Sequence, residues 1–153
     1  MSEDSEWIPR VREESLCPCK SRLSYAECCM PFHHGKAKPK TAEQLMRSRY
    51  SAYFFRKVDY LVETTHPRTK QPGLKEELEK TIDQINWSFL TILDVSKGGE
   101  GDKTGKVEFV AKYFVEGEAY ELHELSRFRR HKGAWKYLDG KAVSYTHLTL
   151  PTN

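Results

Sequence analysis

The sequence predicts an α+β fold, in which helices pack on one face of an antiparallel sheet, with a short cysteine-rich module before it. Between residues 41 and 86, apolar side chains recur at steps of three and four, which is the period of a helix. From residue 87 to residue 139 they recur mostly at every second position, which is the period of a strand. All four cysteines come earlier, within residues 17–29. Helices followed by a run of strands are typical of an α+β domain.

Two helices are predicted in the first half of the domain. Thr41 and Gln44 form a capping-box pattern that begins the first helix. This helix is expected to end near His66, because Pro67 disfavours helical geometry in the residue before it. A second helix is predicted over residues 74–86. The apolar faces of the two helices contain Met46, Tyr50, Tyr53, Phe54, Val58, Leu61 and Val62, and Leu78, Ile82 and Ile85, respectively.

Four strands are predicted to follow as an antiparallel meander, over residues 87–96, 106–116, 119–130 and 134–139. The first connection is the turn-rich segment KGGEGDKTG. Gly117 and the segment HKGA provide the other two turns, because glycine permits the backbone angles of tight hairpins.

The two ends of the chain are excluded from the predicted fold. Residues 1–15 are polar, and we expect them to be disordered. From Val143 the segment VSYTHLTLPTN loses the charged residues of the preceding chain and resembles a sequencing-adapter or vector read-through tail. We therefore expect residues 142–153 to be non-native and a natural C-terminal segment to be missing.

The composition indicates one cytoplasmic domain with a small appendage. The chain has 153 residues, of which 38% are hydrophobic and 31% charged, with a net charge of +3. This balance does not by itself predict nucleic-acid binding. The sequence contains neither a run of 18 apolar residues, as a membrane helix requires, nor an apolar run near its acidic N-terminus, as a secretory signal requires. In a reducing cytoplasm, clustered cysteines are more often metal ligands than disulfides.

The cysteine spacing predicts a structural zinc site. Eight residues separate Cys17-Pro18-Cys19 from Cys28-Cys29, and four thiolates satisfy the tetrahedral coordination of zinc without leaving a position for water. Free thiols or disulfides are the alternatives, but a bond between adjacent cysteines is strained. His33 or His34 could replace Cys29 as the fourth ligand. We favour Cys29 and expect the two histidines to form a solvated polar pair.

Several segments resemble known families. CPCKSRLSYAECC, at residues 17–29, resembles the SEC-C motif, a zinc-binding segment also found at the end of the SecA translocation ATPase. The usual motif has glycine after the second cysteine, where this chain has Lys20. The segments LMRSRYSAY, DYLVETTHP, ELSRF and WKYLDG resemble the YchJ family of bacterial proteins.

The resemblance implies a domain organisation. Residues 16–35 would form the SEC-C module, and residues 41–141 a domain similar to nuclear transport factor 2. That domain is a cone-like α+β fold with a curved sheet wrapped around helices. Many members of the family end in a second SEC-C motif, and its absence here agrees with a foreign tail.

Cone-like folds of this kind often enclose a pocket, and five residues are candidates for it: Arg49, Tyr60, His66, Glu124 and Arg127. Glu124 shares a strand face with Leu122 and Phe128 and is expected to point inward. A buried carboxylate needs a partner, which Arg49 could supply, or Arg127 if a bulge turns it inward. Glu124 or His66 could act as a general acid or base. We favour a structural ion pair, because no arrangement of nucleophile, base and orienting group is visible.

These observations favour a non-enzymatic, zinc-containing cytoplasmic binding or adaptor protein, whose zinc module contacts a protein partner. A small-molecule enzyme that uses the pocket is the alternative. Residues 20–49 contain seven basic and two acidic side chains, so nucleic acid is a third potential partner. No membrane association is expected.

Overall fold

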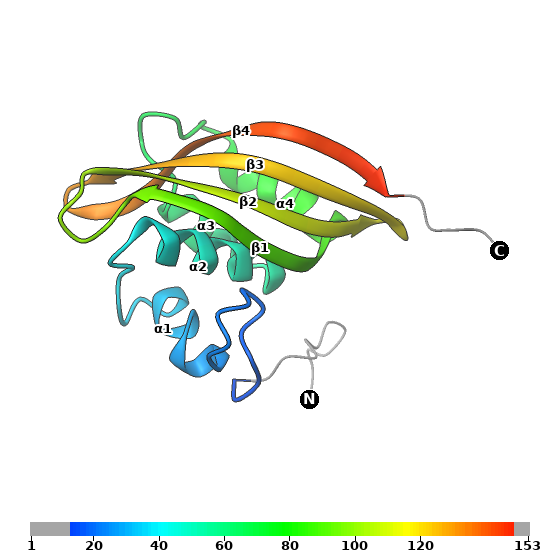
Figure 1. Ribbon diagram of the computed structural model, residues 1–153, viewed down its shortest axis with the longest axis horizontal. Helices are drawn as coiled ribbons and strands as arrows, with labels where there is room; N and C mark the ends of the chain where they lie inside the picture. The colour runs from blue at the N-terminus through cyan, green and yellow to red at the C-terminus, as the bar shows by residue number, and fades with distance from the viewer. Residues whose placement is uncertain (1–12, 149–153) are drawn as a thin grey trace.

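The computed structural model describes residues 13–148, and the outermost parts of both excluded ends lie outside this range. Within this range the first helices are the short 3-10 helix η1 (Tyr25–Glu27) and the one-turn helix α1 (Met30–His33), and both belong to the cysteine module. Figure 1 shows this module on the side of helix α2 (Ala42–Phe54) that faces away from the curved sheet. Helix α2 therefore lies between the module and the sheet.

The first predicted helix is two helices. Helix α2 begins as predicted, because the Thr41 hydroxyl accepts a hydrogen bond of 3.1 Å from the Gln44 N–H. It ends at Phe54, and α3 (Val58–Glu63) follows after a short break. The prediction of one helix through to His66 is wrong. Arg56 has a φ of +60°, and the Lys57 N–H bonds to the Ala52 carbonyl at 2.8 Å, which is a Schellman termination.

The second predicted helix is present but ends early. Helix α4 (Leu74–Thr81) continues into the 3-10 helix η2 (Ile82–Gln84), and the first strand starts directly afterwards. Leu78 and Ile82 are buried as the helical period predicts. They pack with Ala52, Tyr60 and Leu61 in a second, smaller apolar cluster.

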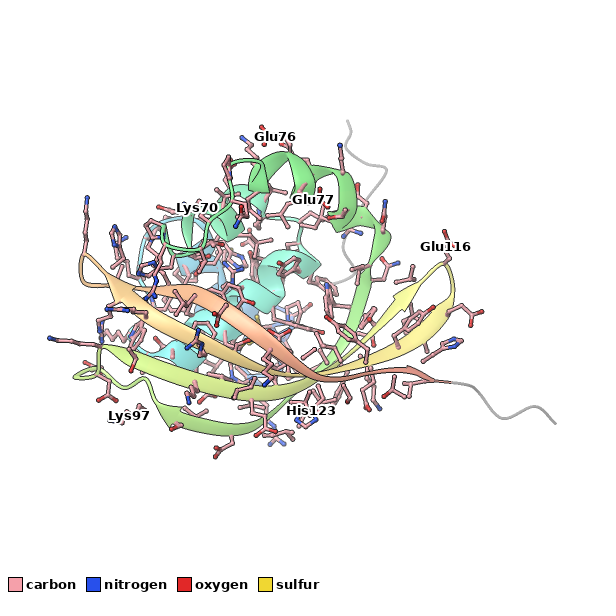
Figure 2. All side chains as sticks on the ribbon, turned by 90° about the horizontal axis from the view of Figure 1, so that it is seen from above. Lys70, Glu76, Glu77, Lys97, Glu116 and His123 are labelled. Carbon is pink, nitrogen blue, oxygen red and sulfur yellow. The ribbon has the colours of Figure 1, made fainter. Side chains whose placement is uncertain are left out.

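The four strands form an antiparallel meander with the order β1-β2-β3-β4. Their bounds are β1 (Asn86–Lys97), β2 (Thr104–Val115), β3 (Glu118–His131) and β4 (Ala134–Leu148). Two connections are tight hairpins whose central residues, Glu116-Gly117 and Lys132-Gly133, all have positive φ, as type I′ turns require. Seen from above, the turn at Glu116 lies at the opposite end of the sheet from Lys97 (Figure 2). This arrangement confirms the predicted α+β fold.

Strand β4 is longer than predicted. It continues past residue 139 to Leu148 and pairs with β3 as far as Ala119. Residues 140–147 are exposed. Main-chain bonds to β3, and the contacts of His147 with Glu118 and Tyr120, therefore hold this extension rather than packing in the core. Strand pairing does not test whether residues 142–153 are foreign to the natural protein, so that expectation stays a prediction.

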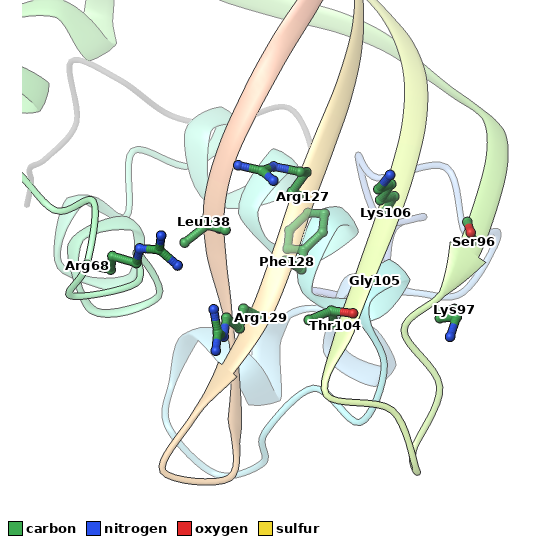
Figure 3. Close-up of a pocket in the computed structure, with 10 residues that line it drawn as sticks. All are labelled: Arg68, Ser96, Lys97, Thr104, Gly105, Lys106, Arg127, Phe128, Arg129 and Leu138. Carbon is green, nitrogen blue, oxygen red and sulfur yellow. The ribbon is translucent and has the colours of Figure 1, made fainter.

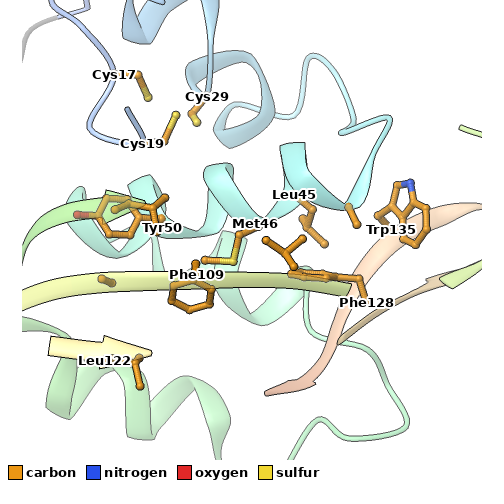
Figure 4. Packing of buried hydrophobic residues seen from close by; sticks show 14 of the residues in the cluster. Cys17, Cys19, Cys29, Leu45, Met46, Tyr50, Phe109, Leu122, Phe128 and Trp135 are labelled. Carbon is orange, nitrogen blue, oxygen red and sulfur yellow. The ribbon is translucent and has the colours of Figure 1, made fainter. Parts of the chain in front are cut away.

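The main core joins the module, α2 and the sheet in one cluster. Leu45, Met46 and Tyr50 of α2 lie between the sulfur atoms of the module and the inner face of the sheet (Figure 4). The largest fully buried side chains are Trp135 and Phe128. The cysteine module is therefore part of the core of the main domain.

The β1–β2 connection is packed tightly against the start of α2. Ala42 donates its N–H to the Gly98 carbonyl at 2.8 Å, and the backbones of Gly98 and Gly105 lie against each other. A Cβ on Gly105 would stand 2.5 Å from the Gly98 Cα atom, so only glycine fits there.

Candidate metal centre

The four cysteines of the module converge on one point. Their ligand atoms all lie within 4.8 Å of one another. The Cys28 Sγ atom lies 3.6 Å from that of Cys19 and 3.7 Å from that of Cys29. Four sulfurs bonded at about 2.3 Å to a tetrahedral ion would be about 3.8 Å apart. The donor set therefore fits a closed tetrahedral metal site, and the structure brings together the four residues predicted from their spacing.

The local backbone explains how the first two sulfurs face the second pair. The Cys17 N–H bonds to the Leu23 carbonyl at 2.8 Å, and the Lys20 N–H bonds to the Cys17 carbonyl at 3.2 Å. Lys20 and Arg22 have φ values of +70° and +77°. The chain thus turns back within a few residues, and two of these residues adopt the left-handed conformation that glycine favours.

The protonation of the thiols is uneven. Hydrogen bonds with Cys17 and then Cys28 hold the pKa of the Cys19 thiol well below its usual range. The hydrogen bond with Cys17 is also the largest cause that lowers the pKa of Cys28, to about 7. Hydrogen bonds with Cys17 and Cys19 raise the pKa of Cys29. The pKa of Cys17 is raised as well, first by its hydrogen bond with Cys19. The two thiols with a lowered pKa lose their protons to a divalent cation more readily.

Polar side chains next to the sulfurs connect the module to α2. The Ser21 hydroxyl lies 3.0 Å from the Cys28 Sγ atom. Arg47 of α2 donates from Nη1 to the Cys19 carbonyl at 2.6 Å, and from Nε to Glu43 at 3.0 Å. Sequence reasoning missed Ser21 and Arg47, since neither has a spacing that distinguishes it from other polar residues.

The prediction that His33 is solvated is wrong, and both of its ring nitrogens bond to groups other than a metal. Its Nδ1 atom accepts a hydrogen bond of 2.7 Å from the Tyr25 hydroxyl, and its Nε2 atom donates one of 2.8 Å to the Ser48 carbonyl. Burial lowers the pKa of His33 to about 4, so the ring is neutral at pH 7. His34 is exposed, as predicted. His33 therefore ties the module to α2.

The main domain contains a cavity of about 360 Å³ between the helices and the inner face of the sheet. Glu124 lines it, as the predicted register of β3 requires, and its carboxylate accepts a hydrogen bond of 2.8 Å from the Ser126 hydroxyl. A Cβ on Gly140 would overlap this carboxylate, so β4 passes close to it. The lining is otherwise largely aromatic: Tyr50, Tyr53, Trp87, Phe109, Tyr113, Tyr137 and Tyr145.

Arg49 lines the same cavity but does not pair with Glu124. No ion pair joins the two among residues 13–148, so the predicted structural ion pair is wrong. Arg49 donates from Nη1 to the Leu61 carbonyl at 2.9 Å and to the Thr64 hydroxyl at 2.7 Å, and its guanidinium lies over the Tyr137 ring. These acceptors lie at the C-terminal end of α3, where the helix dipole favours a cation.

The other three pocket candidates do not line this cavity. The Tyr60 hydroxyl is buried and lies 2.6 Å from the Ser48 hydroxyl. His66 packs against His131, and desolvation lowers its pKa, followed by the positive charge of its neighbours. Arg127 points to the outer face of the sheet and pairs with Asp139, because the irregularities in the β3–β4 pairing leave the alternation of β3 intact. Of the five candidates, the structure brings Arg49 and Glu124 together at one cavity.

Across residues 13–148 no helix is both long enough and apolar enough to cross a membrane.

Comparison with known proteins gives consistent results for both parts of the chain. A family model described as "YchJ, middle NTF2-like domain" matches residues 41–140. A UPF0225 protein of Ralstonia nicotianae is 44% identical over 142 residues, which cover 87% of this chain and 95% of that protein. The UPF0225 protein YchJ of Shigella dysenteriae serotype 1 is 37% identical, with 82% of each chain covered.

Two solved structures share the fold over more than four fifths of this chain. The solution structure of a SEC-C motif containing protein from Rhodopseudomonas palustris has a TM-score of 0.75 and 33% identity, over 84% of this chain and 98% of that one. The crystal structure of a SEC-C motif containing protein from Psychrobacter arcticus has a TM-score of 0.69 and 28% identity, over 83% and 82% of the two chains.

Proposed function

The chain belongs to the YchJ family, and from this premise we propose that it is a zinc-containing cytoplasmic binding or adaptor protein. In this proposal Cys17, Cys19, Cys28 and Cys29 hold one structural zinc ion, and the module built around it contacts a protein partner. Zinc is the metal that a closed set of four thiolates with tetrahedral spacing favours. Because four sulfurs leave no position for water, the ion would stabilise the module rather than catalyse a reaction.

The observation that supports a partner is the exposure of apolar side chains at the turn that holds Cys17 and Cys19. Leu16 is 64% exposed and Leu23 50% exposed, although both flank the ligand turn and Leu16 pairs with Ser24 in a β-bridge. Lys20 and Arg22 project from the same turn. Apolar side chains surrounded by cations, on a backbone held by a metal, suit a partner with a mixed apolar and acidic surface.

An affinity pull-down with three forms of the protein tests this proposal. Wild-type protein with its metal, metal-stripped protein, and the double variant Leu16→Ser/Leu23→Ser are compared. Leu93→Ser is the matched control, because Leu93 is also 50% exposed but lies on β1 away from the ligand turn. We expect a partner that the wild type and the control retain and the other two lose. Identical partner sets from all four samples would contradict the proposal.

Metal analysis of the purified protein tests the zinc assignment separately. We expect about one zinc ion per chain, and loss of that ion when Cys19 and Cys28 are both replaced by serine. A wild-type sample that contains another metal in place of zinc would contradict the zinc assignment while leaving the partner proposal open to the pull-down.

A second candidate function is small-molecule binding or catalysis in the cavity of the main domain. The observation that favours it is the single carboxylate of Glu124 in an aromatic lining, which is typical of ligand sites. Thermal stabilisation by a panel of metabolites tests it. A ligand of this cavity should stabilise the wild type and His66→Ala, since His66 is not part of the lining, but not Glu124→Gln. A panel without any stabilising compound would count against this function.

A further inference from the structure

A groove of about 430 Å³ lies on the outer face of the sheet, separate from the metal centre and from the inner cavity. It is formed by the end of β1, the start of β2, the end of β3, part of β4 and the loop after α3. Figure 3 shows its side chains in front of the strands, with the helices behind them. Five cationic side chains line it: Arg68, Lys97, Lys106, Arg127 and Arg129.

These cations are poorly compensated by acidic residues. Arg127 is paired with Asp139, through Nε to Oδ1 at 2.7 Å and Nη2 to Oδ2 at 2.6 Å. The side chains of the other four make no ion pair or hydrogen bond with any residue in 13–148. Arg68 and Arg127 act on the same carboxyl group, since the pKa of Asp139 is lowered first by its hydrogen bond to Arg127 and to a smaller extent by Arg68. The groove therefore has an excess of positive charge.

The arrangement of the cations on the sheet is unfavourable for the protein alone. Lys106 stands directly opposite Arg127 in the β2–β3 pairing, and Arg129 lies on the same face two residues further along β3. Like charges directly opposite each other destabilise a sheet. Asp139, opposite Arg127 on β4, offsets one of these charges. An anionic ligand would remove the remaining repulsion.

The other lining groups suit phosphate rather than a base or an apolar ligand. Ser96 and Thr104 provide exposed hydroxyls that make no side-chain hydrogen bond within the described residues. The one aromatic side chain among the lining residues, Phe128, is 1% exposed and offers no face for stacking. The cations extend from β1 across to a loop beyond β4, and strands are about 4.8 Å apart. The row of cations is therefore wider than a single phosphate group.

We propose that this groove binds a compact ligand that carries two or more phosphate groups, such as a nucleotide di- or triphosphate or an inorganic oligophosphate. Arg129 and Lys106 provide the charge at its centre, and the hydroxyls of Ser96 and Thr104 donate hydrogen bonds to phosphate oxygens. Guanidinium groups suit this role because they donate two parallel hydrogen bonds to a phosphate.

Calorimetric titration of the full, metal-loaded chain with inorganic tripolyphosphate at low ionic strength tests the proposal. We expect saturable binding that weakens as salt is added, and weaker binding of inorganic phosphate because it reaches fewer cations. The double variant Lys106→Gln/Arg129→Gln should bind about tenfold more weakly, because two charge-assisted hydrogen bonds are lost. Lys112→Gln is the matched control, since Lys112 is exposed on the same strand and the same face but outside the groove.

Circular dichroism and the thermal midpoint show whether the variants remain folded, which is expected because the replaced side chains are exposed. Wild-type protein that does not bind tripolyphosphate would overturn the proposal. So would a folded double variant that binds as tightly as the Lys112→Gln control. A nucleoside triphosphate and a short single-stranded oligonucleotide, titrated in parallel, distinguish the sources of phosphate. If the oligonucleotide binds and the compact phosphates do not, the proposal of a compact ligand is wrong and the groove binds a nucleic-acid backbone instead.

Discussion

At the scale of single residues, Lys20 shows how the turn after the second cysteine forms without the usual glycine. It occupies the position where the SEC-C motif usually has glycine, and its φ of +70° is one that glycine adopts without strain. The lysine side chain is accommodated because its ammonium lies 5.2 Å from the centre of the Phe89 ring on β1. The departure from the motif therefore leaves the turn intact and adds a contact to the sheet.

The backbone of Lys20 leads to a prediction about substitutions. Lys20→Gly relieves the strain but loses the ring contact and adds chain entropy, so the free energy of unfolding should change by no more than about 0.5 kcal/mol. Lys20→Val should lower it by about 1–2 kcal/mol, because a β-branched residue disfavours positive φ. Urea unfolding of the zinc-loaded proteins measures both values. A valine variant as stable as the glycine variant would show that the turn is not constrained as the structure indicates.

His33 predicts a pH dependence of stability. Its pKa is about 4 in the folded chain, lowered by burial from 6.5. Between these values the unfolded chain binds more protons than the folded chain, so stability falls as the pH falls. The contribution of neutral His33 to the free energy of unfolding is fully present above pH 6.5. About 2 kcal/mol of this free energy should be lost between pH 7 and pH 5.

The His33→Gln variant is the reference for this measurement. Metal ligands also protonate in acid, but they do so in both proteins, and the difference in slope isolates the imidazole. Free energies of unfolding at pH 7 and pH 5 should therefore decrease less in His33→Gln than in the wild type. Equal decreases would mean that the ring is solvated.

At the scale of elements, the close packing of the β1–β2 connection on α2 can be tested with one methyl group. In Gly105→Ala the new Cβ would meet the backbone of Gly98 at 2.5 Å from Cα and 2.9 Å from N, which cannot move without displacing the start of α2. We expect a loss of about 2–3 kcal/mol. In Gly101→Ala, in the same connection, the Cβ would meet nothing within 4 Å, and the change should be within about 0.5 kcal/mol. Urea unfolding compares the two.

The elements also show what the sequence could and could not predict. The meander and the inward face of β3 follow from alternation and from turn residues such as Gly117, which are local signals. The break between α2 and α3 was missed because Arg56 adopts a positive φ although it is not glycine. The partners of Arg49 were missed for a different reason, since that break changes the direction of α3 and presents Leu61 and Thr64 as acceptors.

The cysteine cluster was predictable because its four residues lie close together in the sequence. Sulfurs at positions 17, 19, 28 and 29 need a single turn to meet, whereas the contact between His33 and Ser48 depends on how the module packs on α2. The outer groove had no sequence signal of its own, because its cations come from four separate segments.

At the scale of the whole molecule, the shared core would make the stability of the main domain depend on the proposed metal. Cys17, Cys19 and Cys29 belong to the same cluster as Leu45 and the sheet residues behind it. Removal of the proposed metal would leave these sulfurs uncoordinated within the core. We expect a strong chelator to lower the melting temperature of the entire chain by about 10 °C, in a single transition.

Tryptophan fluorescence measures this effect in the main domain. The chain has three tryptophans, so Trp7 and Trp87 are replaced by phenylalanine to leave Trp135 as the emitter. Trp135 is 2% exposed and donates to the Lys40 carbonyl at 3.1 Å, so its emission reports on the sheet and the linker rather than on the module. An unchanged tryptophan transition after chelation, with metal release verified, would show that the two parts fold independently. Re-addition of zinc should restore the original melting temperature.

The place of the sulfurs in the core also has a consequence for biosynthesis. The ligands precede in the chain every helix and strand of the main domain that they pack against. During translation they therefore leave the ribosome before α2 and the sheet have been made. We expect metal capture by the nascent chain to come first, and polypeptides made under zinc starvation to reach full length without a completed interior and to be degraded.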